Sequence, residues 1–445
     1  MTLPVPSRIL VLGGGGREHA LAWKLVREAG VGEVIVGPGS DAIAREPGVR
    51  CVNVEPMDPA AVVALAAEAA DLVVVGPEAP LGAGVADGLV DAGIAVFGPT
   101  RGAARMETSK AFCHEVAAAA GVRMADARAF AGDELEAALA FVRELGTAGS
   151  DAVLKADGLA AGKGVVVTTS MAQALDLVPS FLAGRPSGAA ALVIEARLRG
   201  REASVIAICD GTSAVALPAA RDHKRLCDGD AGPNTGGMGA YSPLPDLDDA
   251  GVKAILESVH RPILAELARR GTPFRGFLYA GLMLTTDGPV LLETNVRLGD
   301  PEAQAILPRI DADLAPLLFA AARGALPPTV PSRIAAKDGA TVAIVLAARG
   351  YPGDPRRGDP IEGLDAAADA GALVFHAGTV ARRRPEGGFG TNGGRVLAVV
   401  GQGRDLADAR DRAERAAAAI IFDGAQRRHD IAADHASPVM TASAR

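Results

Sequence analysis

The chain has 445 residues, more than one hydrophobic core usually serves, and a prior of about 150 residues per domain predicts two to four domains. A formal net charge of -8 and an aromatic content of 3% argue against a nucleic-acid-binding surface, which needs clustered cations and rings for stacking. A local basic pocket for a small anion is compatible with both values.

The cysteines and the apolar runs bear on the compartment. The four cysteines lie far apart and form no CxxC pair, which disfavours a structural zinc site and favours a reducing environment. The apolar run in MTLPVPSRILVLGGGG is too short for a signal sequence, and no stretch of about 18 apolar residues could span a membrane. We therefore expect a soluble, cytoplasmic protein that binds neither nucleic acid nor membrane.

The first hundred residues alternate between strand-like and helical segments. Strand-like runs occupy 8–12, 33–37, 71–75 and 94–97, and helical stretches begin near Glu18, Asp58 and Gly82. Such alternation predicts a parallel sheet with helices on its faces, where ligands bind at the carboxyl ends of the strands. Glycine runs fall at those ends.

A second region begins with a helix after Ser109. Strands are expected on both sides of the glycine loop in 152–169, at 190–198, 276–286 and 289–298, with helices at 171–182 and 253–270. The proline-rich stretch 325–332 predicts a linker. The last hundred residues predict strands at 341–347, 373–376 and 394–400 and a helix at 405–420.

The polar segment RDHKRLCDGDAGPNTGGMGAYSP, 221–243, interrupts an otherwise apolar region. Taken alone, it is typical of a disordered surface linker. A functional loop is the alternative, and its neighbours in the chain decide between the two.

The N-terminal GGGGREHA suggests a nucleotide-binding turn but fails the dinucleotide fingerprint. Glu18 stands where the third glycine belongs, and the second strand ends without an acidic residue for a ribose hydroxyl. A nicotinamide cofactor is thereby disfavoured. The backbone amides of the glycine run could bind a phosphate, or the run could simply form a tight turn.

A second glycine loop, GLAAGKG at 158–164, resembles a Walker A loop but has only three residues between its glycines. Gly164 also replaces the hydroxyl residue that would hold magnesium. A hairpin folding over nucleotide phosphates fits better, and the alternative is an ordinary flexible hairpin. The lysines Lys155 and Lys163 favour the phosphate-binding hairpin.

The stretch LLETNVRLGDPE predicts a metal and anion site. Residues two apart share a strand face, so Glu293, Asn295 and Arg297 are expected to point the same way. A carboxylate beside an amide oxygen suits magnesium, and the guanidinium suits a transferring phosphoryl group. A solvent-facing strand with chance charges is the alternative. Glu195 and Glu202, near a turn in VIEARLRGREAS, would on their own be more typical of a solvated surface.

Together these pieces resemble the glycinamide ribonucleotide synthetases, a family of the ATP-grasp superfamily. The matching segments are GGREHALAW, VVGPEAPL, VFGPT, SKAF, KADGLAAGKGV, DHKR, GPNTGGMGAYSP, GFLYAGLM, RLGDPE, GYPGD, FHAGT and TNGGRVL. The run from Asp222 to Pro243 is the most specific, so the resemblance makes the polar segment part of an active site. Departures include Gly14, where the family usually has Asn, and the hinge EARL.

The resemblance implies an α/β fold in three parts. These are a Rossmann-like parallel domain at 1–106, an ATP-grasp domain at 107–325 with a mobile lid at about 123–192, and a small α+β domain at 333–430. It implies nucleotide-binding residues Lys110, Lys155, Gly158, Gly162, Lys163, Gly164, Glu195, Leu198 and Glu202. It also implies metal ligands Glu293 and Asn295, substrate-binding residues Gly14, Gly15, Gly16, Glu78 and Arg395, and Asp222, Lys224 and Arg297 in both binding and catalysis.

The implied activity is ATP-dependent ligation of glycine to 5-phosphoribosylamine through a glycyl phosphate, in purine biosynthesis. ATP and Mg²⁺ or Mn²⁺ are the expected cofactors, small molecules the only expected partners, and a monomer the expected state. The competing hypotheses are another carboxylate–amine ligase of the superfamily and a nucleotide-binding regulator without turnover.

Overall fold

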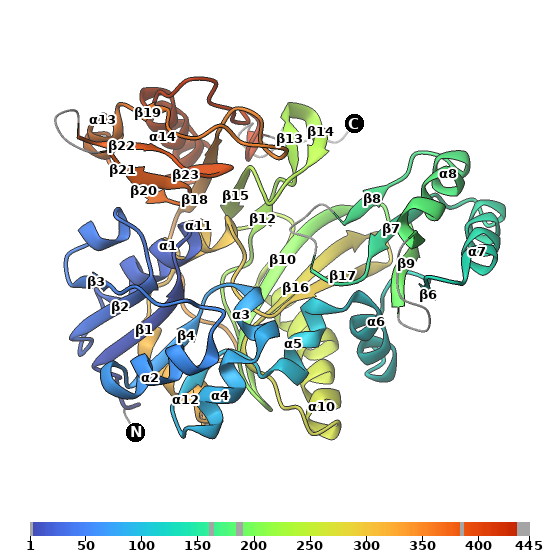
Figure 1. The fold of residues 1–445 in the computed structure, drawn as a ribbon, viewed down its shortest axis with the longest axis horizontal. Coiled ribbons are helices and arrows are strands. Elements are labelled where there is room, and N and C mark those ends of the chain that lie inside the picture. Colours follow the sequence, from blue (N-terminus) through green and yellow to red (C-terminus); the bar gives the residue numbers. More distant parts are fainter. Residues whose placement is uncertain (1–2, 160–163, 184–189, 383–386, 434–445) are drawn as a thin grey trace, which may run out of the picture.

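The computed structural model describes residues 3–159, 164–183, 190–382 and 387–433. Figure 1 shows an N-terminal α/β layer, a central antiparallel sheet, a small sheet with two helices at one end, and a C-terminal sheet above the N-terminal layer. In the described part of the chain no helix is both long and apolar enough to cross a membrane.

The N-terminal layer is a five-stranded parallel sheet in the order β3-β2-β1-β4-β5. Its strands are β1 (Arg8–Gly13), β2 (Glu33–Pro38), β3 (Val49–Cys51), β4 (Leu72–Val75) and β5 (Val96–Phe97), with α1 (Gly16–Leu25), α2 (Pro59–Ala69), α3 (Glu78–Ala83) and α4 (Val85–Asp91) following them. The four predicted strands are confirmed. The edge strand β3 was not predicted, because its three half-exposed residues carry no apolar run.

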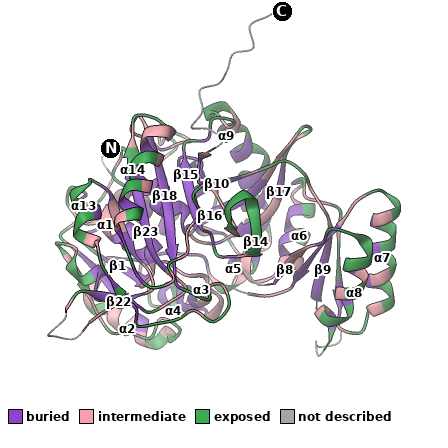
Figure 2. Cartoon of the chain, turned by 90° about the horizontal axis from the view of Figure 1, so that it is seen from above, coloured by how far each residue is buried: buried purple, intermediate pink, exposed green. Residues whose placement is uncertain are grey.

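The small sheet at one end has its own core. It pairs β6 (Ala127–Ala131), β9 (Ala190–Ala196), β7 (Ala152–Ala156) and β8 (Val165–Val167) in that order, with α7 (Leu135–Thr147) and α8 (Met171–Leu182) packed on it. Phe141, Leu154, Val178 and Ile194 are all buried between sheet and helices. The outer faces of α7 and α8 are exposed (Figure 2). This unit overlaps most of the segment 123–192, for which a lid is predicted, and extends past it to Ala196.

The central antiparallel sheet runs β11 (Ala214–Ala216), β10 (Arg201–Asp210), β16 (Arg275–Thr285) and β17 (Gly288–Asn295). Alternate β10 residues face opposite cores: Val205 packs with α9 (Asp249–Ile255) and α10 (Arg261–Arg269), and Ile206 with α12 (Ala315–Ala322). The predicted helix 253–270 is real but interrupted, because a π-helical turn at Leu256–His260 separates α9 from α10.

The C-terminal sheet recruits strands from the middle of the chain. Its order is β12 (Arg221–Asp222), β15 (Gly239–Ser242), β18 (Ala340–Ala347), β23 (Arg395–Gly403) and β20 (Leu373–His376), and α13 (Leu364–Asp369) and α14 (Leu406–Ala419) accompany it. A smaller sheet is formed by β19 (Pro360–Ile361), β22 (Phe389–Thr391) and β21 (Thr379–Ala381).

The polar segment 221–243 is therefore folded at both ends. Strand β12 begins the segment and β15 ends one residue before its last, and between them β13 (Arg225–Cys227) and β14 (Ala231–Asn234) form an antiparallel hairpin. Strand β15 pairs directly with β18, about a hundred residues later in the chain. A loose surface linker would show none of this pairing.

Candidate active site

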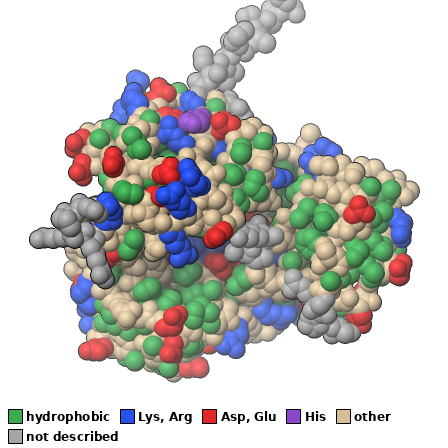
Figure 3. All heavy atoms as spheres, turned by 45° about the horizontal axis from the view of Figure 1, so that its top comes forward, with side chains coloured by type: hydrophobic (Ala, Val, Ile, Leu, Met, Phe, Trp, Pro, Cys, Tyr) green, Lys and Arg blue, Asp and Glu red, His purple; other side chains and the backbone are tan. Residues whose placement is uncertain are grey.

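The predicted site residues gather where the N-terminal layer, the central sheet and the polar segment meet. Figure 3 shows the surface hollowed between the upper and lower lobes of the molecule, with basic and acidic side chains at the mouth. The site is built from the start of β10, the end of β17, the residues after β12, and α5 (Arg101–Thr108) with α6 (Lys110–Ala119).

Lys224 is shared by two carboxylates from the central sheet. Its Nζ lies 3.1 Å from Oε2 of Glu202 on β10 and 3.4 Å from Oε1 of Glu293 on β17. Burial lowers the pKa of Lys224, but Glu202, Glu293 and Asp222 together raise it well above its usual value. The ammonium of Lys224 in turn lowers the pKa of Glu293 to about 2, against the opposing effect of burial. Both groups are therefore charged at neutral pH.

Asp222 lies in β12, opposite Ala240 of β15, and brings a further carboxyl group to the same region. Burial raises its pKa well above the ordinary aspartate value. Lys224 opposes that shift, whereas the carboxylates of Glu302, Glu202 and Glu293 add to it. Asp222 therefore holds a proton more readily than an exposed aspartate does, which suits a group that exchanges protons with an amine.

Glu293 and Asn295 lie on one face of β17, as predicted, opposite Gly281 and Tyr279 of β16. Their carboxylate and amide oxygens are hard donors that suit Mg²⁺ or Mn²⁺. Among the residues that the structure describes, no group of three or more His, Cys, Asp or Glu could hold a metal ion.

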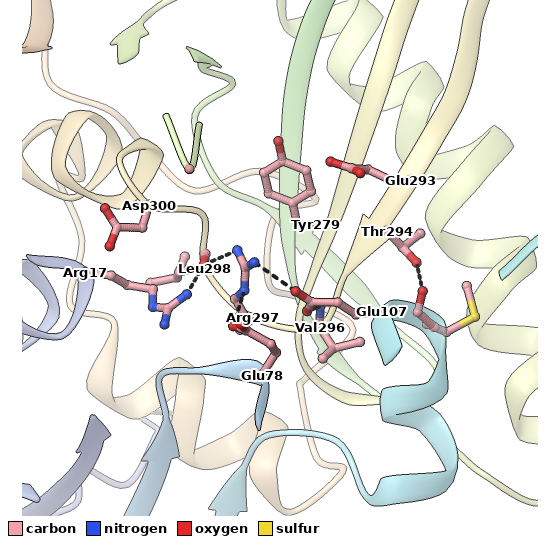
Figure 4. Close-up of polar contacts among 12 residues, drawn as sticks. Arg17, Glu78, Glu107, Tyr279, Glu293, Thr294, Val296, Arg297, Leu298 and Asp300 are labelled. Carbon is pink, nitrogen blue, oxygen red and sulfur yellow. Dashed lines mark hydrogen bonds and ion pairs between the residues drawn. The ribbon is translucent and has the colours of Figure 1, made fainter. Parts of the chain in front are cut away.

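Arg297 lies beyond the end of β17, so the shared strand face predicted for all three side chains does not extend to it. Strand β17 ends at Asn295, and the guanidinium turns to the N-terminal layer instead. Its Nε lies 3.2 Å from Oε2 of Glu78, and its Nη2 lies 2.8 Å from Oε1 of Glu107 (Figure 4). Burial alone would lower the pKa of Arg297, but the carboxylates of Glu107 and Glu78 outweigh burial and raise the pKa above its ordinary value. Arg297 is a permanent cation.

Of the two carboxylates that pair with Arg297, only one was predicted from the sequence. Glu78 was predicted as a substrate ligand, whereas Glu107, in the segment before SKAF, was not singled out. Burial alone would raise the pKa of Glu78, but the charges of Arg297 and Arg17 outweigh it, and the pKa is lowered overall. Burial raises the pKa of Glu107. Arg17 donates to the Leu298 carbonyl at 3.1 Å, so two arginines flank the loop after β17.

The predicted nucleotide lysines come from α6 and β7. Nζ of Lys155 lies 2.7 Å from Oε1 of Glu195 and donates to the Leu292 carbonyl at 2.9 Å. Nζ of Lys110 donates to the Gly158 carbonyl at 2.8 Å, and burial lowers its pKa. These contacts link both lysines to the predicted adenine and phosphate positions.

Other predicted nucleotide residues lie around this pair. The Gly164 carbonyl accepts a hydrogen bond from the Ala156 amide at 2.7 Å, and Leu198 is half-buried in the turn between β9 and β10. Gly162 and Lys163 lie outside the described residues. His114, which was not predicted, places Nε2 2.8 Å from Oε1 of Glu195. Burial alone would raise the pKa of Glu195, but His114 and Lys155 outweigh it, and the pKa is lowered overall.

The N-terminal glycine run is tightly packed. The Gly15 amide donates to Oε2 of Glu18 at 2.8 Å at the start of α1, which is the glutamate half of a capping box, because Gly15 has no side chain to supply the other half. A Cβ on Gly14 would lie 2.5 Å from the Gly39 carbonyl oxygen, and one on Gly16 would lie 2.7 Å from Nε2 of Gln304. Close approach therefore explains these glycines even before a phosphate is considered.

Arg395, predicted to bind phosphate, contacts protein groups. Its Nη2 lies 3.4 Å from Oδ2 of Asp300, and its Nη1 donates to the carbonyls of Gly236 and Asp300. The Tyr351 hydroxyl accepts from the Gly236 amide at 2.8 Å. Arg395 and Tyr351 thus hold the end of the polar segment against the loop after β17.

Three family models match this chain in succession. They describe the N domain, the ATP-grasp (A) domain and the C domain of phosphoribosylglycinamide synthetase, at residues 7–107, 108–303 and 341–434. The chain belongs to the phosphoribosylglycinamide synthetase family. This membership confirms the resemblance inferred from the motifs.

Relatives and solved structures agree with this assignment. The phosphoribosylamine–glycine ligase of Streptomyces coelicolor is 49% identical over 432 residues, covering 96% of this chain and 99% of the relative. That of Caulobacter vibrioides is 45% identical over 425 residues, covering 95% and 97%. The crystal structure of the Thermotoga maritima phosphoribosylamine–glycine ligase matches with a TM-score of 0.78 at 33% identity, covering 95% of this chain and all of that one.

The fold extends beyond the phosphoribosylglycinamide synthetase family. Campylobacter jejuni biotin carboxylase, at 17% identity, matches with a TM-score of 0.66 over 95% of this chain and 93% of that one, which shows a shared fold alone. The predicted α/β fold class is thereby confirmed. Like other members of its ATP-grasp family, this chain is an ATP-dependent ligase that uses a divalent metal.

Proposed function

We infer that this chain joins glycine to 5-phosphoribosylamine with consumption of ATP, yielding glycinamide ribonucleotide, ADP and phosphate in purine biosynthesis. The observation that carries this function is the full-length match to phosphoribosylamine–glycine ligases across all three family domains. The charged residues around Lys224 supply the groups that such a ligation needs.

A free carboxylate is a poor electrophile, so we propose that ATP first phosphorylates glycine to glycyl phosphate and releases ADP. The amine of phosphoribosylamine then attacks the acyl carbon of glycyl phosphate, and inorganic phosphate leaves. Lys110, Lys155 and Arg297 would neutralise the anionic oxygens of the nucleotide and of the transferring phosphoryl group. Asp222, whose pKa is raised, would accept the proton that the attacking amine loses. Lys224 would pair with the reacting carboxylate or phosphoryl group.

The metal would be Mg²⁺ or Mn²⁺, held by Glu293 and Asn295. A divalent cation supplies charge neutralisation at the phosphate oxygens when it is bound. Because the pKa of Glu293 is about 2, its carboxylate is ionised and ready to bind a cation at any physiological pH. Lys224 shares this carboxylate and would have to share it with the metal as well.

The remaining nucleotide and substrate contacts are proposed from the motifs. Glu195, Leu198 and Glu202 would surround adenine and ribose, and Gly158 to Gly164 would cover the phosphates. Gly14, Gly15, Gly16 and Glu78 would bind phosphoribosylamine. Arg395 would bind the phosphate of phosphoribosylamine only through guanidinium donors that do not already contact Asp300 and Gly236.

We further propose the division into domains at 1–106, 107–325 and 333–430, a monomeric state and a cytoplasmic location. The linker 325–332 lies between α12 and β18. The acidic net charge of -8 supports small molecules, rather than nucleic acids, as the partners.

The decisive experiment measures ADP release by the purified protein with ATP and magnesium. ADP should form only when glycine and freshly generated phosphoribosylamine are both present, and the product should have the mass of glycinamide ribonucleotide. Turnover with a different carboxylate or amine in their place would establish another ligase instead. Binding of ATP without turnover under any of these conditions would establish a regulator.

A further inference from the structure

Arg428, in the segment after α14, is buried to 1% exposure although it carries a full charge. Its Nε and Nη2 form a two-pronged contact with the carboxylate of Asp430, at 2.7 and 2.6 Å. Its Nη1 reaches a distant part of the chain, lying 2.6 Å from Oδ1 of Asp230 and 3.2 Å from the Arg225 carbonyl oxygen. A buried guanidinium with all three nitrogens engaged is a specific, fixed contact.

The contact is reciprocal. The Gly229 amide donates to Oδ2 of Asp430 at 2.8 Å, and the His429 amide donates to Oδ1 of Asp228 at 2.7 Å. Residues 428–430 and the tip of the β13–β14 hairpin, 228–230, thus exchange hydrogen bonds in both directions. We call this set of contacts the hairpin latch.

The hairpin tip needs such a latch. Asp230 has a φ of +51°, in the left-handed region that non-glycine residues rarely adopt. Such a conformation persists only when its surroundings hold it. The ion pair with Arg428 supplies that hold at the carboxylate of Asp230 itself.

The same hairpin holds Lys224. Arg225, whose carbonyl accepts from Arg428, is the next residue in the chain. The Lys224 carbonyl accepts from the Thr235 amide at 2.7 Å and from its hydroxyl at 2.9 Å, across the base of the hairpin. The backbone that carries Lys224 is therefore fixed from both hairpin strands.

The hairpin also touches the small sheet at the other side of the hollow. Nδ2 of Asn234, the last residue of β14, donates to the Val165 carbonyl at 3.4 Å, at the start of β8. One rigid hairpin thus lies between the C-terminal segment, Lys224 and the strand that leaves the glycine loop.

We propose that Arg428 is a positioning residue for Lys224: it fixes the β13–β14 hairpin so that the ammonium stays between Glu202 and Glu293. The effect of Arg428 on turnover rests on the proposed function, in which Lys224 acts on the reacting group. Its effect on the hairpin does not. Arg428 itself touches no substrate.

The first test compares Arg428→Met with Arg427→Met, a matched control whose guanidinium faces Glu414 of α14 at 3.7 Å instead of the hairpin. Arg428→Met should lower kcat at least tenfold, leave the KM for glycine within about twofold, and speed amide exchange at 225–234 at least tenfold. Arg427→Met should change none of these. Arg428→Lys, which keeps the charge, should recover part of kcat. Equal effects of the two methionine variants would overturn the proposal.

The second test removes the residue through which Arg428 acts. In a Lys224→Ala background, adding Arg428→Met should change the residual kcat less than twofold, whereas independent, multiplying losses would overturn the proposal. Should Arg428→Met fail to fold, Asp230→Asn replaces it, because that side chain is 70% exposed. If the wild type makes no glycinamide ribonucleotide, the proposed function fails, while hydrogen exchange at 225–234 still decides whether the latch exists.

Discussion

At the scale of single residues, Glu293 is a proposed metal ligand and also pairs with Lys224. Glu293→Gln keeps the shape but removes the charge that Lys224 contacts and that the proposed metal ion would need. We expect kcat to fall by about two orders of magnitude or more, since charge neutralisation at a phosphoryl group is worth several kcal/mol. Titration of activity with magnesium should show that saturating metal does not restore it.

The control for this variant is Glu257→Gln, whose carboxylate pairs with Arg261 on the exposed side of a helix. This substitution should leave turnover and melting temperature nearly unchanged, because exposed ion pairs contribute little. Full activity of Glu293→Gln at limiting magnesium would remove Glu293 from the site.

Gly14 and Gly15 differ in what a side chain would meet. A Cβ on Gly14 would be pressed to 2.5 Å from a backbone oxygen of Gly39, whereas on Gly15 it meets only the end of the Glu18 side chain, at 3.0 Å. Gly14→Ala should therefore cost about 1–3 kcal/mol of unfolding free energy, as overpacking does, and Gly15→Ala clearly less. Thermal unfolding of the two variants side by side tests the difference. Equal melting temperatures would contradict it.

Sequence reasoning identified the charged residues of the site better than their partners. Lys155 and Glu293 stand out because the first lies beside a glycine loop and the second at the end of an apolar strand, whereas Lys110 is implied only by the family resemblance of SKAF. The partners of the charged residues do not stand out: Glu107 meets Arg297 across 190 positions, and His114 meets Glu195 across 81. Local patterns carry no information about such pairs, which depend on how distant elements are packed.

At the scale of elements, strands β7 and β8 flank the glycine loop and carry or contact the predicted phosphate ligands. If the loop covers bound nucleotide, ATP with magnesium should slow amide exchange at Gly158, Gly164 and the two strands. The outer helix α14 serves as the internal control, because it lies on the far side of the C-terminal sheet (Figure 1). Unchanged exchange around the loop on addition of ATP would count against its role.

The same scale shows where element prediction succeeds and where it fails. Helix α8 was predicted with its observed bounds, because Ser170 caps it and its apolar residues recur at helical spacing. Strands β12 and β15 were not predicted, since Arg221–Asp222 has two polar residues and Gly239–Ser242 carries no alternation. Strand β15 pairs with β18, which lies about a hundred residues later in the chain, and β12 pairs in turn with β15, so their conformation depends on a distant strand.

At the scale of the whole molecule, two buried histidines make stability depend on pH. Burial lowers the pKa of His260 to about 4 and that of His376 to about 3, from an ordinary value near 6.5. Both are neutral in the folded state while the unfolded chain binds protons, so stability is lost as the pH falls below about 6.5. Each should contribute up to about 1.4 kcal/mol per pH unit between roughly pH 4 and pH 6.

Denaturant unfolding at several pH values measures this slope. His260→Asn should reduce it over that interval, whatever the variant does to stability at neutral pH, because the group that takes up a proton on unfolding is gone. An unaltered slope in His260→Asn would mean that this histidine is already protonated in the folded protein.

The pairing of β15 with β18 also has a consequence in time. Gly239 lies opposite Ile344, so a ribosome must add about a hundred more residues after the polar segment before its partner strand exists. At about 5–20 residues per second, that interval lasts roughly 5–20 s. During this interval the N-terminal layer and the central sheet can already form, whereas the strand pair that carries Asp222 and precedes Lys224 still lacks its neighbour β18. The framework behind these two residues is therefore completed late in synthesis, and a nascent chain that ends before β18 holds the N-terminal layer and the strands of the central sheet without it.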